Sequence, residues 1–157
     1  MTSTAWYASP TKRPVHGRNP ARSLSGGRGE RHPALGTGNW TIEGWVYPKL
    51  DPNTGQQIFD FRTGSTNHTA LTFQNGDLRY IVDSQYAIIT SASNEPKANR
   101  WYHFAVVKNS NTTTLYVNGQ NYGTYSDTIN YLANSSAKIG VFRSGAAAFF
   151  KGYISDF

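Results

Sequence analysis

Residues 40–48, Trp-Thr-Ile-Glu-Gly-Trp-Val-Tyr-Pro, are the stretch that decides the fold. The run is short, rich in aromatic and β-branched side chains, and typical of a β-strand. From residue 39 onward the sequence repeats this pattern, with short apolar stretches separated by turn residues. We predict ten strands, at 40–47, 57–62, 69–74, 77–83, 86–91, 101–108, 113–118, 120–125, 137–142 and 149–156.

Turn residues between these segments predict antiparallel hairpins. Asn118-Gly119 and Asn75-Gly76 favour two-residue hairpin turns, and residues 108–111 predict a third turn. No sustained helical period is present, and Gly, Asn and Thr recur too often for a long helix. The pattern therefore indicates an all-β antiparallel sandwich or barrel, and the lack of an internal repeat argues against a propeller.

The segment 101–108 is expected to be a central strand. Alternate residues point to opposite faces, and both sets are largely apolar: Tyr102, Phe104 and Val106 in one, and Trp101, His103, Ala105 and Val107 in the other. A strand that is apolar on both sides is usually covered on both sides. His103 is accordingly expected to be a hydrogen-bonded core residue.

Six segments, taken in order, resemble the laminin-G-like, concanavalin A-type jelly rolls, including those of bacteriophage virion proteins. They are 40–48, 57–61 (QIFDF), 100–107 (RWYHFAVV), 114–119 (TLYVNG), 138–140 (KIG) and 152–157 (GYISDF). The resemblance implies an antiparallel two-sheet sandwich (concanavalin A-like jelly roll) over residues 36–157, preceded by an extended N-terminal arm over residues 1–35.

Two family strands have no counterpart in this sequence. Family members carry one strand before the segment that resembles 40–48 and one after the segment that resembles 152–157, and these two strands are neighbours in one sheet. Their loss would leave an open sheet edge, which favours pairing with another chain. The segment 4–8 is a candidate replacement strand, either within the chain or in a neighbour, so a homo-oligomer is one expectation.

The N-terminal region carries most of the net charge of +6. Residues 1–38 hold six cations and one carboxylate, 6 − 1 = +5, whereas residues 39–157 hold nine and eight, 9 − 8 = +1. We expect the arm to bind an acidic protein surface. The alternative interpretation is a solvated tail that binds no partner. No helix-turn-helix or other nucleic-acid motif supports nucleic acid as the partner. The expected partner-binding residues are Trp6, Tyr7, Lys12, Arg13, Arg18, Arg22, Leu24, Arg28 and Arg31.

Catalytic and metal motifs are not found in the sequence. There is no cysteine, and no histidine pair has ligand spacing. Sandwich-fold glycanases need closely spaced carboxylates, but Glu43 has no acidic residue two or four positions away and is expected to be structural. Residues 51–55 offer some oxygen ligands for calcium but lack a dedicated ligand pattern, so a plain turn is favoured and no cofactor is predicted.

A glycan site needs exposed aromatic rings beside amide or carboxylate groups. The best candidates in one stretch of sequence are Asn121, Tyr122, Tyr125, Asp127, Asn130 and Tyr131. Simple packing of these rings at a sheet edge is the favoured alternative.

The leading prediction is a non-catalytic virion structural protein, a capsid decoration or cement protein whose arm clamps neighbouring capsid subunits. The resemblance to virion proteins implies the major capsid protein as its partner and the virion as its location. No signal peptide or long apolar span is visible in the sequence. The alternative is a carbohydrate-binding, lectin-like module of a phage fibre or adhesin that recognises host glycans.

Overall fold

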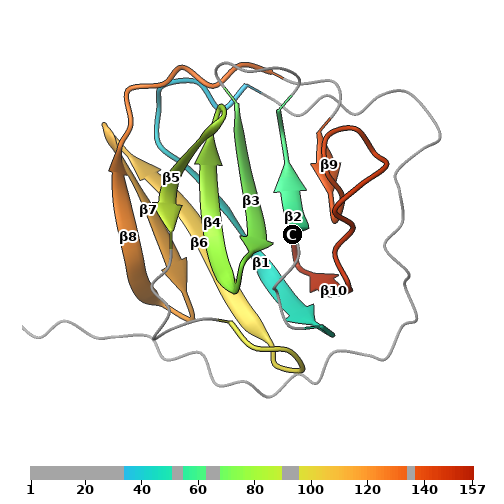
Figure 1. Cartoon of the computed structure of the whole chain (residues 1–157). Helices are drawn as coiled ribbons and strands as arrows, with labels where there is room; N and C mark the ends of the chain where they lie inside the picture. Colours follow the sequence, from blue (N-terminus) through green and yellow to red (C-terminus); the bar gives the residue numbers. More distant parts are fainter. Residues whose placement is uncertain (1–33, 51–54, 63–67, 90–95, 134–136) are drawn as a thin grey trace, which may run out of the picture.

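The computed structural model describes residues 34–50, 55–62, 68–89, 96–133 and 137–157 (Figure 1). This part of the chain contains ten strands: β1 (Trp40–Pro48), β2 (Gln56–Asp60), β3 (Thr69–Gln74), β4 (Asp77–Val82), β5 (Gln85–Ile89), β6 (Tyr102–Asn109), β7 (Thr112–Val117), β8 (Gln120–Ser126), β9 (Lys138–Ile139) and β10 (Gly152–Ser155). No helix in these ranges is long and apolar enough to cross a membrane.

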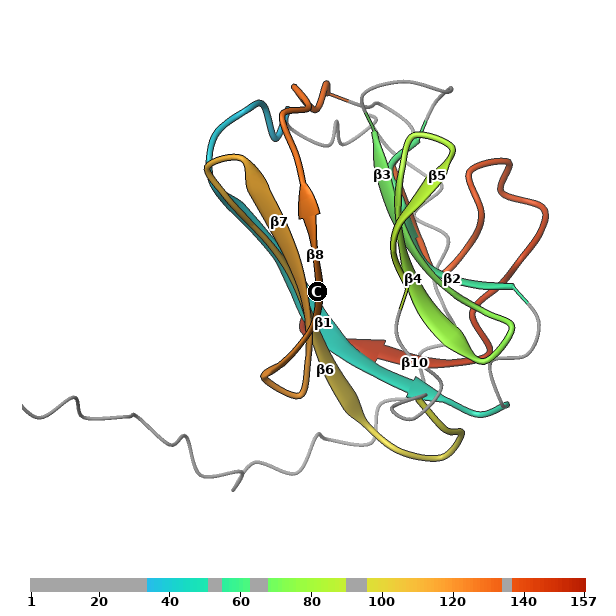
Figure 2. The ribbon, with the colours of Figure 1, turned by 60° about the vertical axis from the view of Figure 1, so that its left-hand side comes forward.

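The strands form two antiparallel sheets of five strands each, ordered β10-β1-β6-β7-β8 and β5-β4-β3-β2-β9. Figure 2 shows the two sheets facing each other as separate layers. The predicted antiparallel two-sheet sandwich is therefore confirmed. The two Asn-Gly hairpins are confirmed as well: Asn75 and Gly76 join β3 to β4, Asn118 and Gly119 join β7 to β8, and all four have positive φ.

The core lies between the sheets and is built from alternate residues of each strand. In β1, Ile42 and Val46 point inward and are buried, and Gly44 lies between them. A Cβ at Gly44 would lie 3.3 Å from the Phe104 ring, so the glycine lets that ring pack directly on β1. Side chains with no exposed surface come from both sheets: Val46, Phe59, Leu71, Phe73, Tyr80, Phe104, Val106 and Leu115.

Two predicted strands are shorter than expected. The segment 137–142 forms a strand only over Lys138–Ile139, and 149–156 only over Gly152–Ser155. Between them the chain has positive φ at Gly140, Gly145 and Ala148, and such a backbone cannot continue a strand. The segment is instead held by backbone hydrogen bonds, including Gly140 N–H to the Ile58 carbonyl at 2.8 Å.

β6 is a central strand, between β1 and β7, but it is not covered on both faces. Phe104 and Val106 are buried on the inner side, as predicted, whereas Trp101 is 38% exposed and His103 is half-buried on the outer side. The expectation that His103 is a core residue is therefore wrong. Alternation separates the two faces of a strand, but it does not say whether a second layer covers an apolar face.

The predicted arm and its replacement strand at 4–8 lie outside the described residues, apart from the last two arm positions. Leu35 packs partly buried against the core. Gly36 exchanges two backbone hydrogen bonds with Tyr131, at 2.9 and 3.1 Å. The described chain thus enters the sandwich beside the segment that follows β8.

Candidate ligand-binding surface

The outward face of β1 alternates cleanly with its buried face. Thr41, Glu43 and Trp45 are exposed, whereas their neighbours Ile42, Gly44 and Val46 are buried. Tyr47 continues the outward row and is half-buried. Because β1 lies between β10 and β6, the outward rings of all three strands come together.

Four aromatic side chains and one histidine form what we call the aromatic surface: Trp45, Tyr47, Trp101, His103 and Tyr153. The Tyr47 ring centroid lies 5.4 Å from that of Trp101 and 5.8 Å from that of Tyr153. The Trp45 and His103 centroids are 5.2 Å apart. Trp45 and Tyr153 are each 42% exposed. Large rings gathered and left open to water in this way are typical of a binding surface.

Backbone and side-chain contacts fix these rings in place. Strand pairing sets Tyr47 opposite Tyr153 and Trp45 opposite His103. The Asn99 N–H donates to the Pro48 carbonyl at 2.7 Å, which holds the segment before β6 against the end of β1. The rings therefore belong to a rigid sheet and need little ordering when a ligand arrives.

Charged groups stand at both ends of the aromatic surface. At one end Glu43 Oε2 lies 3.4 Å from His103 Nε2, and the Glu43 side chain is 59% exposed. At the other end Lys49 Nζ lies 4.7 Å from the centroid of the Tyr153 ring. Along β1 the outward residues thus run from a carboxylate, through two aromatic rings, to an ammonium group.

The sequence-predicted glycan residues do not gather on one exposed face. Asn121 and Asn130 are both exposed at the surface. Tyr122 and Tyr125 are partly buried against the core, which fits the alternative of edge packing. Asp127 and Tyr131 are 0% and 1% exposed, so the prediction that they contact a sugar is wrong for these two residues.

Asp127 and Tyr131 belong to a buried polar network instead. Lys108 Nζ lies 2.9 Å from Asp127 Oδ1 and donates to the Asp127 carbonyl at 2.7 Å. Thr113 and Tyr131 hydroxyls donate to Asp127 Oδ2 at 2.6 and 2.9 Å. The Tyr131 hydroxyl is also 3.3 Å from that of Tyr80 on the opposite sheet. The network ties the segment after β8 to both layers.

Burial and hydrogen bonding shift the pKa values in this network. Burial alone would raise the pKa of Asp127, but hydrogen bonds from Thr113, Lys108, Ile129 and Tyr131 outweigh it and hold that pKa below its ordinary value. Burial raises the pKa of both Tyr80 and Tyr131 well above the ordinary tyrosine value. Asp127 therefore stays ionised and both tyrosines stay neutral near neutral pH, as expected of a structural network.

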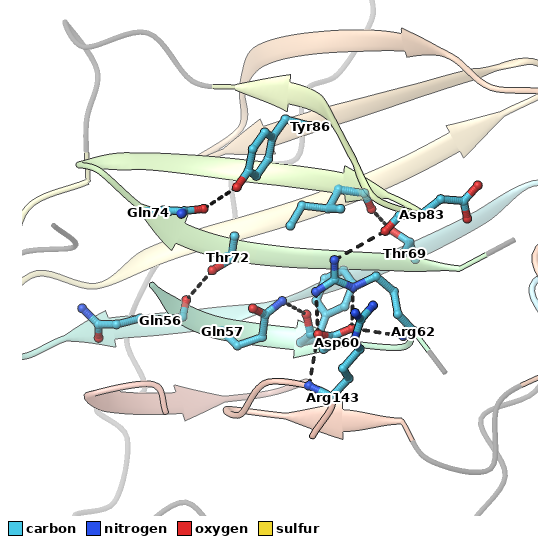
Figure 3. Close-up of polar contacts among 12 residues, drawn as sticks. Gln56, Gln57, Asp60, Arg62, Thr69, Thr72, Gln74, Asp83, Tyr86 and Arg143 are labelled. Carbon is cyan, nitrogen blue, oxygen red and sulfur yellow. Dashed lines mark hydrogen bonds and ion pairs between the residues drawn. The ribbon is translucent and has the colours of Figure 1, made fainter. Parts of the chain in front are cut away.

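A second polar cluster fastens β2 (Figure 3). Asp60 accepts from Arg62 Nε at 2.8 Å and from Arg62 Nη2 at 2.7 Å, and from the Arg143 backbone N–H at 3.2 Å. The Arg62 and Asp60 side chains are buried, at 8% and 0% exposure. With its oxygens engaged and no access to solvent, this carboxylate holds the loop after β9 rather than serving a ligand.

The remaining predicted sites concern metal and the arm. No group of three or more histidine or acidic residues in the described part could hold a metal ion. Residues 51–54 of the calcium candidate are not among the described residues. The same is true of every predicted arm residue: Trp6, Tyr7, Lys12, Arg13, Arg18, Arg22, Leu24, Arg28 and Arg31.

The fold agrees with a family comparison. Residues 27–157 match the family described as the concanavalin A-like lectin/glucanases superfamily. The chain belongs to this superfamily. The match begins within the predicted arm. No curated protein matches this concanavalin A-like chain.

Three solved structures show the same fold. A heptameric SAP-like pentraxin from Limulus polyphemus is 19% identical, with a TM-score of 0.59 over 80% of this concanavalin A-like chain and 64% of its own. Domain 4 of an extracellular arabinanase from Geobacillus stearothermophilus, solved with arabinotriose, is 20% identical, with a TM-score of 0.62. This match covers 80% of the present chain and 62% of the arabinanase domain's chain. Mouse laminin α1 domains LG4-5 are 10% identical, with a TM-score of 0.56, and the match covers 79% of the present chain and 36% of the laminin chain. The chain thus spans less than two thirds of each of these proteins.

The sequence held a signal for part of the aromatic surface. Trp45 and Tyr47 occupy the same alternation as the polar residues Thr41 and Glu43, which marks them as outward-facing. No comparable signal marks Tyr153, because its position depends on pairing between β10 and β1, which lie far apart in the sequence.

Proposed function

We propose that this domain is a non-catalytic, carbohydrate-binding module that holds a glycan on the aromatic surface. The observation that carries the proposal is the row of outward-facing rings Tyr153, Tyr47 and Trp101, of which the outer two are 42% and 38% exposed. The flat apolar face of an aromatic ring matches the C–H face of a sugar ring, while the tyrosine hydroxyl and tryptophan N–H can hydrogen-bond to sugar hydroxyls.

The polar groups beside the rings suit the same task. Glu43 and His103 lie next to Trp45 and can accept and donate hydrogen bonds to hydroxyl groups. A sugar hydroxyl is both donor and acceptor, so a carboxylate beside an imidazole can satisfy it. An open, rigid face of this kind suits the side of a polysaccharide chain better than a small molecule, which normally needs an enclosing pocket.

The arrangement of carboxylates supports binding rather than hydrolysis. A glycosidase needs two carboxyl groups about 5–9 Å apart across the scissile bond. Among the described outward-facing residues of β1, β6, β7 and β10, Glu43 is the single carboxylate. Asp60 and Asp127, the two carboxylates buried in polar clusters, are 0% exposed.

Two comparisons support a binding role in different ways. The superfamily takes its name partly from lectins, and a domain of similar fold was solved with arabinotriose. These likenesses support the class of function, and the aromatic surface supports the site.

A glycan array with the full chain tests the proposal, with Tyr153→Ala as the disabling variant. The matched control is Tyr86→Ala, because Tyr86 is 45% exposed on the other sheet and loses the same number of atoms. We expect wild type to bind at least one glycan, Tyr153→Ala to bind it about tenfold more weakly, and Tyr86→Ala to bind it within about twofold. The proposal fails if the wild type binds no glycan, or if the two variants weaken binding equally.

A second candidate function is capsid decoration, supported by the net charge of +5 in residues 1–38. In this proposal the arm lies over acidic surface between major capsid subunits, and the aromatic surface projects outward. Deleting residues 1–35 should release the protein from particles while leaving glycan binding intact. Retention of the shortened chain on particles would count against it.

A further inference from the structure

Two lysines extend the aromatic surface beyond Tyr47 and Tyr153. Pro48 pairs with Gly152, and the next residues outward, Lys49 and Lys151, are joined by a backbone hydrogen bond of 2.7 Å from the Lys49 N–H to the Lys151 carbonyl. Alternation places Lys49 on the same face as Tyr47, and Lys151 on the same face as Tyr153. Both lysines are exposed.

These cations have no acidic partner among the residues that the structure describes. Within the described part of the chain neither lysine forms an ion pair, and both ammonium groups lie near aromatic rings. Lys49 Nζ is 4.7 Å from the Tyr153 centroid, and Lys151 Nζ is 5.9 Å from that of Phe149. The two lysines flank the last residue pair of β1 and β10, so both cations stand at one end of the aromatic surface and attract an anion there.

The charge pattern also gives the surface a direction. Glu43 lies at the end of the aromatic surface remote from Lys49, so an anion is repelled at one end of the row and attracted at the other. The four outward residues from Glu43 to Lys49 span about 20 Å at roughly 3.3 Å per residue, which is long enough for several sugar units.

We propose that the ligand of the aromatic surface is an acidic polysaccharide of the polyuronate class. Its sugar rings stack on Tyr47 and Trp101, and a ring carboxylate pairs with Lys49 and Lys151. This inference rests on the proposed function and names its ligand class. A uronate carries its carboxylate directly on the sugar ring. Lys49 Nζ lies over the aromatic ring of Tyr153, which neighbours Tyr47. The carboxylate can therefore reach this ammonium group while the sugar stays stacked on Tyr47. A sulfate ester holds its charge further from the ring.

The experiment compares one sugar backbone with and without its charge. The full chain is titrated calorimetrically with a linear oligogalacturonate and with the fully methyl-esterified form, which keeps the rings and removes the carboxylates. The variant is Lys49→Gln with Lys151→Gln, and the matched control is Lys138→Gln on β9 of the other sheet. We expect the acid to bind about tenfold more tightly than the ester, the double variant to bind both about equally, and the control to keep the preference.

Several outcomes would overturn the inference. Equal binding of acid and ester by the wild type would do so, and so would a preference that survives in the double variant. The inference would also be overturned if a sulfated glycan or single-stranded DNA bound and the oligogalacturonate did not. If the ester binds as well as the acid and Tyr153→Ala weakens both, the ligand class is wrong but the proposed function holds. If no glycan binds at all, both fail.

Discussion

Lys108 Nζ lies 2.9 Å from Asp127 Oδ1 in the interior of the sandwich, where the two side chains are 1% and 0% exposed. Lys108 stands on β6, and Asp127 follows β8, so the pair ties the segment after the last hairpin to the middle of the sheet. Lys108 Nζ also donates to the Asp127 carbonyl, and the Asp127 carboxylate also accepts from the Thr113 and Tyr131 hydroxyls. Removing one partner of such a buried pair lowers the stability of a protein far more than replacing both partners together.

Removing one charge of this pair should therefore destabilise the fold strongly. We expect Lys108→Met to lower the free energy of unfolding by about 3–5 kcal/mol, because Asp127 keeps its charge in a buried site. The double variant Lys108→Met with Asp127→Asn should recover at least about 1 kcal/mol of that loss. Urea denaturation measures both. Asp77→Asn, in the more exposed pair of Asp77 with Arg79, is the control and should cost less than about 1 kcal/mol. Equal stability of Lys108→Met and wild type would contradict the prediction.

The lowered pKa of Asp127 predicts acid sensitivity. Because the folded pKa lies below the unfolded value of about 3.9, this carboxylate contributes stability that is fully present above about pH 5 and is lost as the pH falls through the folded pKa. The difference in unfolding free energy between wild type and Asp127→Asn should shrink on going from about pH 6 to about pH 2.5. Thr113→Val removes one of the hydrogen bonds that lower this pKa, so its acid-dependent loss of stability should be smaller than that of wild type and should end at a higher pH. Parallel curves for all three proteins would refute the assignment.

Gly152 is required for the pairing of β10 with β1. A Cβ at this position would overlap the Tyr47 carbonyl and press on the Phe150 ring. We expect Gly152→Ala to lower the unfolding free energy by at least about 2 kcal/mol and to weaken glycan binding, since Tyr153 would shift with the strand. Gly38→Ala is the matched control, because a Cβ there would have no atom within 4 Å, and it should change stability by less than about 0.5 kcal/mol. A stable Gly152→Ala protein with intact binding would be inconsistent with this packing.

The exposure of Trp45 and Trp101 can be measured without a ligand. In a background with Trp6→Phe, acrylamide should quench the fluorescence of these two residues readily and that of half-buried Trp40 less. Replacing Trp45 and Trp101 together by Phe should remove most of the quenchable emission. If the emission that remains from Trp40 is quenched as readily as the original, the aromatic surface is not open as described.

The sequence predicts the strands of the sandwich well because alternation and turn chemistry are local. The Asn118-Gly119 hairpin, for example, is fixed by two residues that tolerate positive φ. It predicts the site poorly because a site depends on which strands become neighbours. Tyr131 and Asp127 follow a tyrosine-rich strand in sequence, yet the chain turns inward there to meet Lys108. Tyr47 and Tyr153 meet on one face only through the register of β1 with β10.

The two sides of β6 serve separate tasks. Trp101 and His103 lie on the open face, while Phe104, Val106 and Lys108 anchor the interior. Substitutions on one side therefore have little reason to disturb the other. The domain should act as a scaffold: a library randomised at positions 43, 45, 47, 103 and 153 should retain folded members whose sugar preferences differ.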